Sequence, residues 1–279
     1  LAVRGATAHG LPASIHFDGS SSNALKISGC IIDEAGFWNL QIKDSEHGYL
    51  AYSNASKAEA EPEKYLYWGD MHGQTRQTVG TGMLEDYYSF SRDKACIQFT
   101  GWQGNDFEVS DETWADIRKF TKKFNEEGKF LVYLGYEWSG TTPQGGDHNV
   151  YFLHDNADFY PSSNWTATSV DNKNNANPIT ELHSKLESRN DVLLIPHIGG
   201  RYANLDYFNY AYSSVIEIHS HHGTFEWFAL DAMKRHMPVG FIAASDDHTC
   251  RVGLSYPLSG HGKYPGLLGS PRNDCTRRR

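Results

Sequence analysis

The sequence predicts an α/β protein in which a small β-rich module, residues 1–60, precedes a larger domain of alternating strands and helices, residues 61–279. Two observations lead to this prediction. In residues 1–60, short apolar runs are separated by Ser-rich and Gly-rich stretches, which is typical of strands joined by turns. From Tyr65 onward, short apolar runs alternate with amphipathic segments of helical length, which is typical of a parallel α/β domain.

Three strands are expected in the β module. Ala24–Ser28 and Phe37–Lys43 alternate between apolar and polar residues, and Gly48–Ser53 is a further apolar run. The following stretch, Ser56–Lys64, is rich in Ala, Glu and Lys and contains Pro62, which predicts a linker. We find no catalytic pattern in this module, so function is expected in the larger domain.

Seven strands and four helices are expected in the larger domain. The strands are Tyr65–Met71, Ala95–Gly101, Phe130–Glu137, Asn149–Leu153, Val192–His197, Ser214–His219 and Val239–Asp246. The helices between them are Met83–Lys94, Asp111–Glu127, Pro178–Arg189 and Thr224–His236. Ser110 is a favourable N-cap for the second helix, and Asn177 is expected to cap the third, with Pro178 at its first position.

Composition restricts the class of function. The formal net charge of −9 argues against nucleic acid or an anionic membrane as the main partner. The apolar runs are too short for a transmembrane helix. The four cysteines are widely spaced, which predicts neither a zinc knuckle nor a disulfide framework. The 14 histidines fit metal sites and ordinary surface use equally well.

The two ends of the sequence carry weaker expectations. Because the sequence begins at Leu1, we expect that an upstream segment has been removed, which leaves cytoplasmic and periplasmic or secreted locations open. Since Asn273–Arg279 closes no structural element, a truncated C-terminus is expected. The sequence predicts no particular oligomeric state.

Most of the predicted strands end in side chains that can bind a metal ion. These residues are His72, Glu137, His197, His219, Asp246 and His248, and the fourth strand is entered through His148. The carboxyl ends of parallel strands meet at one edge of a barrel or sheet. A single buried His at such a place is more often a structural residue, but several unpaired polar groups would cost about 1–3 kcal/mol each. A bound cation would satisfy them together, so a metal site is predicted.

The stretch Gly240–Thr249 shows this pattern most clearly. The apolar run Phe241–Ala244 ends abruptly at polar residues, and Asp246 and His248 lie two positions apart. Alternate residues of a strand point to the same side, so these two side chains should project together. A carboxylate oxygen beside an imidazole nitrogen suits a divalent transition metal.

Four motifs together resemble the PHP (polymerase and histidinol phosphatase) superfamily, and within it the DUF3604 group. They are Tyr67–Gln74, Gly135–Gly140, Gly146–Phe152 and Ala244–His248. The resemblance covers about residues 65–255. It implies a distorted seven-stranded (β/α) barrel of PHP type with two or three metal ions, and it implies the ligands His72, Gln74, Glu137, His148, His197, Asp246 and His248.

Two departures from the family pattern change the expected number of ions. Gln74 stands where most members have a second His, and Trp102 lies where a ligating His is expected. We therefore expect one or two divalent ions, Mn, Zn or Fe. Because an indole nitrogen only donates hydrogen bonds, Trp102 is expected to form a wall of the pocket. Its neighbours Gln103, Asn105 or Asp106 would line the site.

The resemblance implies a metal-dependent hydrolase, most readily of phosphate esters on a small anionic molecule. Glu137 would bridge ions, and Asp246 would bind an ion and orient the attacking water. His219 would protonate the leaving group or serve only as a hydrogen-bond partner. The candidates for substrate binding are Arg201, His222, Arg251 and Asp70. The alternatives are hydrolysis of another ester, an amide or a glycosidic bond, or a non-catalytic binding or regulatory module on a degenerate barrel.

Overall fold

The computed structural model describes residues 2–3, 7–16, 27–53, 56–61, 67–162 and 174–255. The chain divides into two compact units, Leu1–Leu66 and Tyr67–Arg279. Within the described ranges, no helix has both the length and the apolar character needed to cross a bilayer. The predicted C-terminal truncation concerns a stretch outside the described residues.

The first unit contains short antiparallel strand pairs. Strands β1 (Ala2–Val3), β5 (Leu40–Lys43) and β6 (Leu50–Tyr52) form one sheet, in the order β1-β5-β6. Strand β2 (Ala8–His9) pairs with β3 (Ile31–Ile32), and β4 (Gly36–Trp38) pairs with β7 (Ser56–Ala58).

Two predictions for this unit are corrected. The run 37–43 is not one strand, because it divides at Asn39 into β4 and β5, which belong to different sheets. At the division, the side chain of Asn39 donates to the carbonyl of Ser53 at 2.9 Å. The predicted linker begins with strand β7, since its first residues pair with β4. Of the strand predicted over 24–28, residues 24–26 lie outside the described residues, and residues 27–28 are not in a strand.

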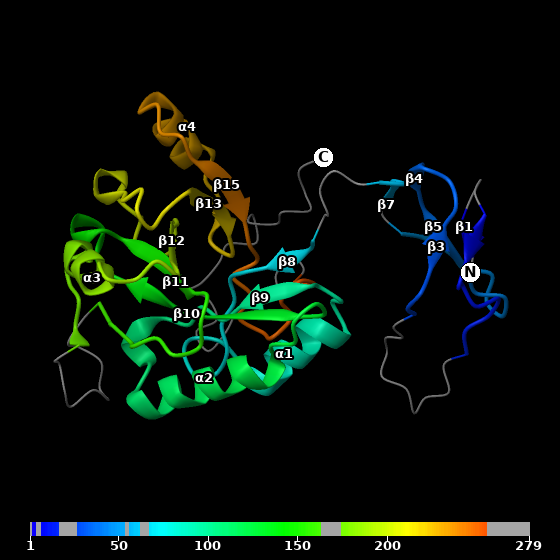
Figure 1. Cartoon of the computed structure of the whole chain (residues 1–279), viewed down its shortest axis with the longest axis horizontal. Coiled ribbons are helices and arrows are strands. Elements are labelled where there is room, and N and C mark those ends of the chain that lie inside the picture. The colour runs from blue at the N-terminus through cyan, green and yellow to red at the C-terminus, as the bar shows by residue number, and fades with distance from the viewer. Residues whose placement is uncertain are drawn as a thin grey trace. The chain divides into compact units, whose positions relative to one another are not determined.

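The second unit has a mixed α/β fold with a curled sheet (Figure 1). Its larger sheet has the order β12-β11-β10-β9-β8, and its smaller sheet has the order β14-β13-β15. The strands are β8 (Gly69–Asp70), β9 (Phe99–Gly101), β10 (Leu131–Ser139), β11 (Asp147–Phe152), β12 (Val192–Pro196), β13 (Val215–Ser220), β14 (Gly223–Thr224) and β15 (Gly240–Ala243). Isolated bridges, His197 to Glu217 and Gly73 to Asp247, connect the two sheets.

The main strand β11 runs against the prediction of a parallel domain, and so does the short strand β14, which is antiparallel to β13. Strands β8, β9 and β10 are parallel, as are β13 and β15, but β11 is antiparallel to both β10 and β12. Parallel neighbours need a crossover of a dozen or more residues, whereas residues 140–146 form only a short turn between β10 and β11. The amino end of β11 therefore lies beside the carboxyl end of β10.

The four predicted helices are present, with ends that differ by a few residues. They are α1 (Leu84–Asp93), α2 (Asp111–Phe124), α3 (Ile179–Leu186) and α4 (Glu226–Lys234). Short 3-10 helices lie at Asp106–Glu108, Thr142–Gln144 and Leu205–Tyr207. Ser110 caps α2 as expected, accepting from the backbone N–H of Thr113 at 3.1 Å. The expected cap of α3 is wrong, because Pro178, with an extended ψ of −176°, is itself the N-cap.

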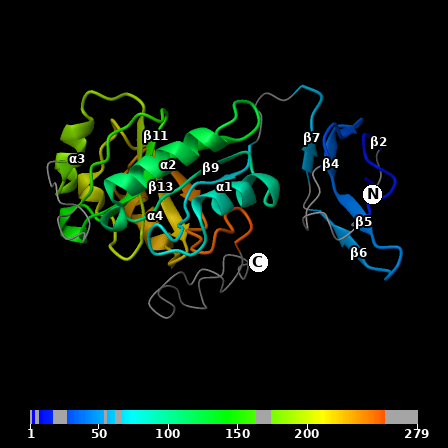
Figure 2. The same cartoon turned by 90° about the horizontal axis from the view of Figure 1, so that it is seen from below.

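Helices α1 and α2 cover one face of the larger sheet, as Figures 1 and 2 show from two directions. Trp114, Ile117 and Phe124 recur along α2 at helical spacing, and all three are buried. Strand β10 is buried along most of its length, including Trp138 close to its end. This packing gives the carboxyl end of β10 a rigid support, and Glu137 lies there.

Close packing at Gly135 of β10 leads to a stability prediction. A Cβ atom at this position would lie 2.1 Å from Nε2 of Gln103 and 2.3 Å from the carbonyl oxygen of Val150. We expect Gly135→Ala to lower the free energy of unfolding by about 1–3 kcal/mol. Urea denaturation measures this change. Gly200→Ala is the control, because a Cβ there meets nothing within 4 Å, and equal midpoints for the two variants would contradict the prediction.

Candidate metal centre

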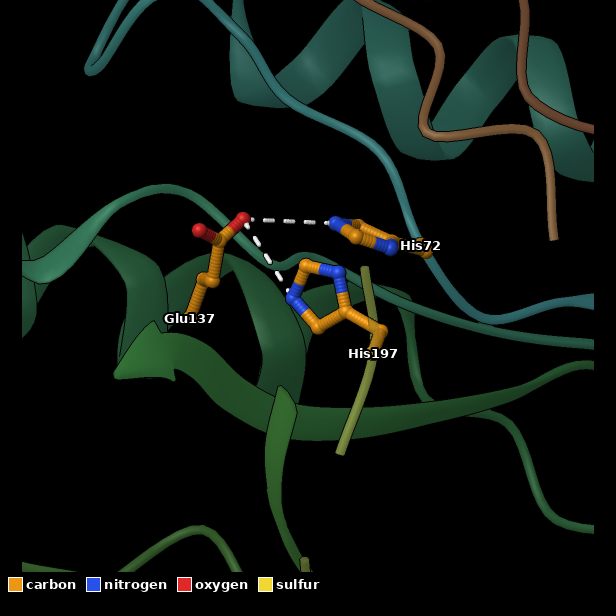
Figure 3. A group of neighbouring side chains, drawn as sticks. All are labelled: His72, Glu137 and His197. Atoms are coloured by element: carbon orange, nitrogen blue, oxygen red, sulfur yellow. Dashed lines mark ion pairs between the residues drawn. The ribbon is translucent and has the colours of Figure 1, made fainter. Parts of the chain in front are cut away.

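His72 is the central side chain of a buried cluster (Figure 3). Its Nε2 atom lies 3.4 Å from Oε2 of Glu137 and 3.3 Å from Oδ1 of Asp246. The rings of His72 and His197 are 4.8 Å apart and nearly perpendicular. His72, Glu137 and His197 each offer one ligand atom, and these atoms lie within 4.8 Å of one another, so the three residues could hold a metal ion.

Segments far apart in the sequence bring these side chains together. His72 follows β8, Glu137 lies near the end of β10, and His197 directly follows β12. Asp246 follows β15, and its Oδ1 atom lies 3.1 Å from Nε2 of His248. The backbone of Asp246 has a φ of 48°, a strained conformation that Asp tolerates better than most residues. The strand ends therefore converge on one cluster.

Several nitrogen atoms of the cluster have no hydrogen-bond partner. Among the described residues, these include both ring nitrogens of His197, Nε2 of His72 and Nδ1 of His248, and all are buried. Nε2 of His197 lies 3.9 Å from Oε2 of Glu137, which is beyond hydrogen-bond distance. Buried polar groups are nearly always paired, so these lone pairs fit the donor set of a divalent cation.

The opposite side of the His72 ring is held by protein groups. Its Nδ1 atom lies 3.0 Å from Oε1 of Glu217, and Nδ2 of Asn149 lies 3.1 Å from Oε2 of Glu217. A proton on Nδ1 can be donated to Glu217, which leaves the lone pair of Nε2 directed at Glu137 and Asp246. Metal-binding His side chains are commonly oriented by a carboxylate in this manner.

His219 was the expected site residue of strand β13, but Glu217 is the residue beside His72. Alternation in a strand would place both side chains on one face. The pairing of β13 with β15 shifts between these two residues, so the alternation is interrupted. His219 is half-buried, and its Nδ1 atom lies 2.8 Å from the hydroxyl of Thr224. The polar residues at the end of this strand, Glu217–Ser220, indicated that a site residue lies here, but the sequence could not distinguish Glu217 from His219.

The second oxygen of Glu137 is surrounded by donors. Oε1 accepts from Nδ2 of Asn105 at 2.7 Å, from Nη2 of Arg201 at 3.2 Å and from the hydroxyl of Ser139 at 3.2 Å. Only Oε2 faces His72 and His197. The carboxylate is therefore fixed in one orientation.

Arg201 lies at the cluster, but its donors are engaged with protein carboxylates. Nε donates to Oδ1 of Asp147 at 2.6 Å, and the guanidinium lies 5.3 Å from the ring centre of Phe107. Asp147 was not among the expected site residues, although it lies within the motif Gly146–Phe152. Arg201 was expected to bind substrate, but two of its side-chain nitrogens already bind Asp147 and Glu137.

The other substrate-binding candidates lie in different surroundings. Nε2 of His222 is 3.9 Å from Oδ2 of Asp246, and its side chain is 23% exposed, so it lies at the accessible side of the cluster. Arg251 lies over the ring of Phe90 in α1. Asp70 is buried and accepts the backbone N–H groups of residues 245 and 253, so it anchors the segment after β15.

The two departures from the family pattern are buried. The amide oxygen of Gln74 accepts from the hydroxyl of Thr78 at 2.8 Å. The indole N–H of Trp102 donates to the hydroxyl of Thr75 at 2.9 Å, and the ring belongs to the hydrophobic core. Of the residues expected to line the site, Asn105 contacts Glu137, Gln103 donates to the carbonyl of residue 150, and Asp106 accepts from residues 139 and 162.

His148 is buried at the amino end of β11, beside β10 and β12. It was expected among groups at carboxyl ends, and the antiparallel course of β11 explains its place. Its Nδ1 atom lies 3.0 Å from the carbonyl oxygen of Gly146. Because a carbonyl oxygen can only accept, the proton of the neutral ring lies on Nδ1, and Nε2 carries a lone pair. His148 is not among the three residues that share the 4.8 Å spacing.

Burial and charge set the protonation of the cluster. Burial lowers the pKa of His197 to about 3 and that of His148 to about 4, so both rings are neutral near pH 7, as metal ligands must be. Burial alone would lower the pKa of His72, but the carboxylates of Asp246 and Glu217 raise it well above its usual value, so a metal ion that binds Nε2 would displace a proton. Burial opposes ionisation of Glu137, yet the neighbouring ring of His72 lowers its pKa to about 2.

The fold and the cluster define a mixed α/β protein with a buried His and carboxylate centre. Residues 55–205 match the family described as "Protein of unknown function (DUF3604)". The chain belongs to the DUF3604 family.

Similar proteins come from three species of Chlamydia. The chain is 22% identical over 273 residues to an uncharacterized protein of Chlamydia trachomatis, covering 88% of this chain and 42% of that protein. An uncharacterized protein of Chlamydia pneumoniae has the same identity and coverage, and one of Chlamydia muridarum is 25% identical over 125 residues, 43% of this chain and 20% of that protein. The chain thus spans less than half the length of these curated relatives.

A solved structure is also similar. It is the crystal structure of a two-domain protein containing a predicted PHP-like metal-dependent phosphoesterase from Bacteroides vulgatus. The two chains are 12% identical with a TM-score of 0.41, over 66% of this chain and 52% of the other.

Proposed function

We propose that this chain is a metal-dependent hydrolase and that a phosphate ester of a small anionic molecule is its substrate. The observation that carries the proposal is the position of His72 Nε2, which faces a carboxylate oxygen of Glu137 and one of Asp246 beside the unpaired nitrogens of His197. The choice of a phosphate ester rests on the resemblance of the motifs to the PHP superfamily, which is weaker support than the geometry of the cluster.

The residues that would hold a divalent ion are His72, Glu137, His197 and Asp246, with His148 and His248 adjacent. A bound divalent ion would lower the pKa of water toward neutrality and polarise an ester oxygen. Glu217 keeps His72 oriented, and Asn105 and Arg201 hold Glu137. His222 lies at the exposed side, where it would donate a hydrogen bond to the substrate.

We also propose that the two sheets of the second unit are parts of one distorted barrel of PHP type. The isolated bridges support this, since one joins the end of β12 to β13 and the other joins the segment after β8 to the segment after β15. The backbone N–H of Gln74 also donates to the carbonyl of Asp247 at 2.8 Å, which holds the first and last strand ends together.

Activity assays test the proposal. The purified chain is stripped of metal and supplied with Mn²⁺, Zn²⁺ or Fe²⁺, and hydrolysis of p-nitrophenyl phosphate, bis(p-nitrophenyl) phosphate and p-nitrophenyl acetate is measured. We expect metal-dependent hydrolysis of a phosphate substrate. Hydrolysis of the acetate alone would favour another ester as substrate. Metal binding without hydrolysis across a wider panel that includes amides and glycosides would favour a binding module on a degenerate barrel.

The contact between Glu217 and His72 leads to a prediction about affinity. Glu217→Gln removes the charge that orients and polarises the His72 ring, so we expect metal affinity to fall by about 10–100-fold. Isothermal titration with Mn²⁺ or Zn²⁺ measures this fall. Glu187→Gln is a matched control, because Glu187 is exposed at the end of α3. If both variants bind metal as tightly as the wild type, Glu217 does not support His72.

A further inference from the structure

A permanent positive charge of the protein lies inside the proposed metal centre. The guanidinium of Arg201 lies between two buried carboxylates, with Nε 2.6 Å from Asp147 and Nη2 3.2 Å from Glu137. The backbone N–H of Arg201 donates to the other oxygen of Asp147 at 2.9 Å, so the pair is held at both oxygens. An arginine remains protonated at any ordinary pH, and the guanidinium therefore acts here as a fixed cation.

The bonding of Glu137 restricts how many ions it can serve. A carboxylate that bridges two ions through both oxygens must offer a lone pair of each oxygen to a metal. Oε1 of Glu137 already accepts from Asn105, Arg201 and Ser139 at 2.7–3.2 Å. Oε2 alone faces His72 and His197. Glu137 can thus offer one oxygen, on the side of the two histidines.

The charges of the cluster lead to the same conclusion. Arg201 pairs with both Asp147 and Glu137, so its positive charge lies directly beside these two carboxylates. A second divalent ion near Asp147 would lie against the positive guanidinium, and like charges at this separation repel strongly where water is excluded. Asp147 and Arg201 are both part of the buried or half-buried interior, so solvent does little to weaken that repulsion.

We infer that the centre takes one divalent cation, and that the guanidinium of Arg201 occupies the place that a second cation would need. This inference rests on the proposed function, since it concerns the same metal centre. It departs from the two or three ions that the family resemblance implies, and it assigns Arg201 a positioning role toward Glu137 and Asp147 rather than a substrate-binding one.

Metal stoichiometry tests the inference directly. The chelator-stripped chain is titrated with Mn²⁺, bound ion is counted by equilibrium dialysis, and the spectrum of the bound ion is recorded by electron paramagnetic resonance. For the wild type we expect one tight equivalent with the spectrum of an isolated Mn²⁺. Arg201→Met removes the positive charge and the side-chain donors that Arg201 directs at Asp147 and Glu137, so we expect the count to rise from one to two, with coupling between the two ions. Arg201→Lys keeps the charge, so we expect the count to stay at one.

The possible outcomes separate this inference from the proposed function. No tight equivalent in the wild type would overturn the metal centre and the proposed function with it. Two or more tight, coupled ions in the wild type would overturn only the inference about Arg201. A count that stays at one in both Arg201→Met and a second uncharged variant, Arg201→Gln, would also overturn it. Circular dichroism establishes that each variant is folded, and the wild-type count decides the number of ions independently of any variant.

Discussion

A chelator is expected to lower the thermal midpoint of the wild-type chain, and Mn²⁺ or Zn²⁺ is expected to restore it. Asp246 follows β15, the last strand of the second unit, and His72 follows β8, its first strand. Both residues belong to the cluster. One ion bound by both residues would hold the two ends of the fold together. Binding only to the folded state stabilises it by about 4 kcal/mol at a thousandfold excess over Kd, which raises the midpoint of a domain of this size by several degrees.

The matching variant is Asp246→Asn, which keeps the shape of the side chain and removes its charge. We expect it to melt near the chelated wild type and to show no response to added metal. Asp116→Asn is the control, because Asp116 is exposed on α2, and its metal response should equal that of the wild type. Differential scanning calorimetry with and without chelator measures all of these midpoints. An equal metal response in Asp246→Asn and the wild type would remove Asp246 from the metal centre.

Glu137→Gln is expected to abolish metal binding while leaving the fold intact. The three donors around Oε1 require an acceptor, so the amide oxygen of Gln would take that place. The amide NH₂ group would then face the nitrogens of His72 and His197, where its partial positive charge repels a cation. The substitution thus exchanges a metal ligand for a hydrogen-bond donor without opening a cavity.

The expected loss of metal affinity and of any metal-dependent hydrolysis exceeds about a hundredfold, because removal of partners outside the ligand shell already costs 10–100-fold. In chelator, the thermal midpoint should stay close to that of the wild type, because Gln keeps the size of Glu and the acceptor for the three donors around Oε1. Glu187→Gln again serves as the matched control. Wild-type metal affinity in Glu137→Gln would show that Glu137 is not a ligand.

Local sequence patterns were sufficient for much of the fold. Apolar runs and helix caps predicted the four helices and the positions of the seven main strands, because these signals depend on neighbours within a few residues. The same patterns selected His72, Glu137, His197 and Asp246, since each follows or ends an apolar run. Their convergence follows from the rule that strand ends meet at one edge of a sheet.

Other features depend on contacts between distant parts of the chain. Glu217 lies beside His72 although 145 positions separate them, and a shift in strand pairing brings it there instead of His219. The antiparallel direction of β11 follows from a short turn, and it carries both His148 and Asp147 to the cluster. A pattern of residue types contains neither the pairing register nor the direction of a strand.

The sequence by itself determined which side chains follow the strands and that several of them are metal ligands by type. Only the tertiary structure decided what each of those side chains bonds to. In the folded chain, the guanidinium of Arg201 binds Asp147 and Glu137 and is not left for a substrate. The amide oxygen of Gln74 accepts a hydrogen bond from Thr78. The physical reason is that a hydrogen bond depends on the position of the partner in space to within a few tenths of an ångström, and folding alone sets that position.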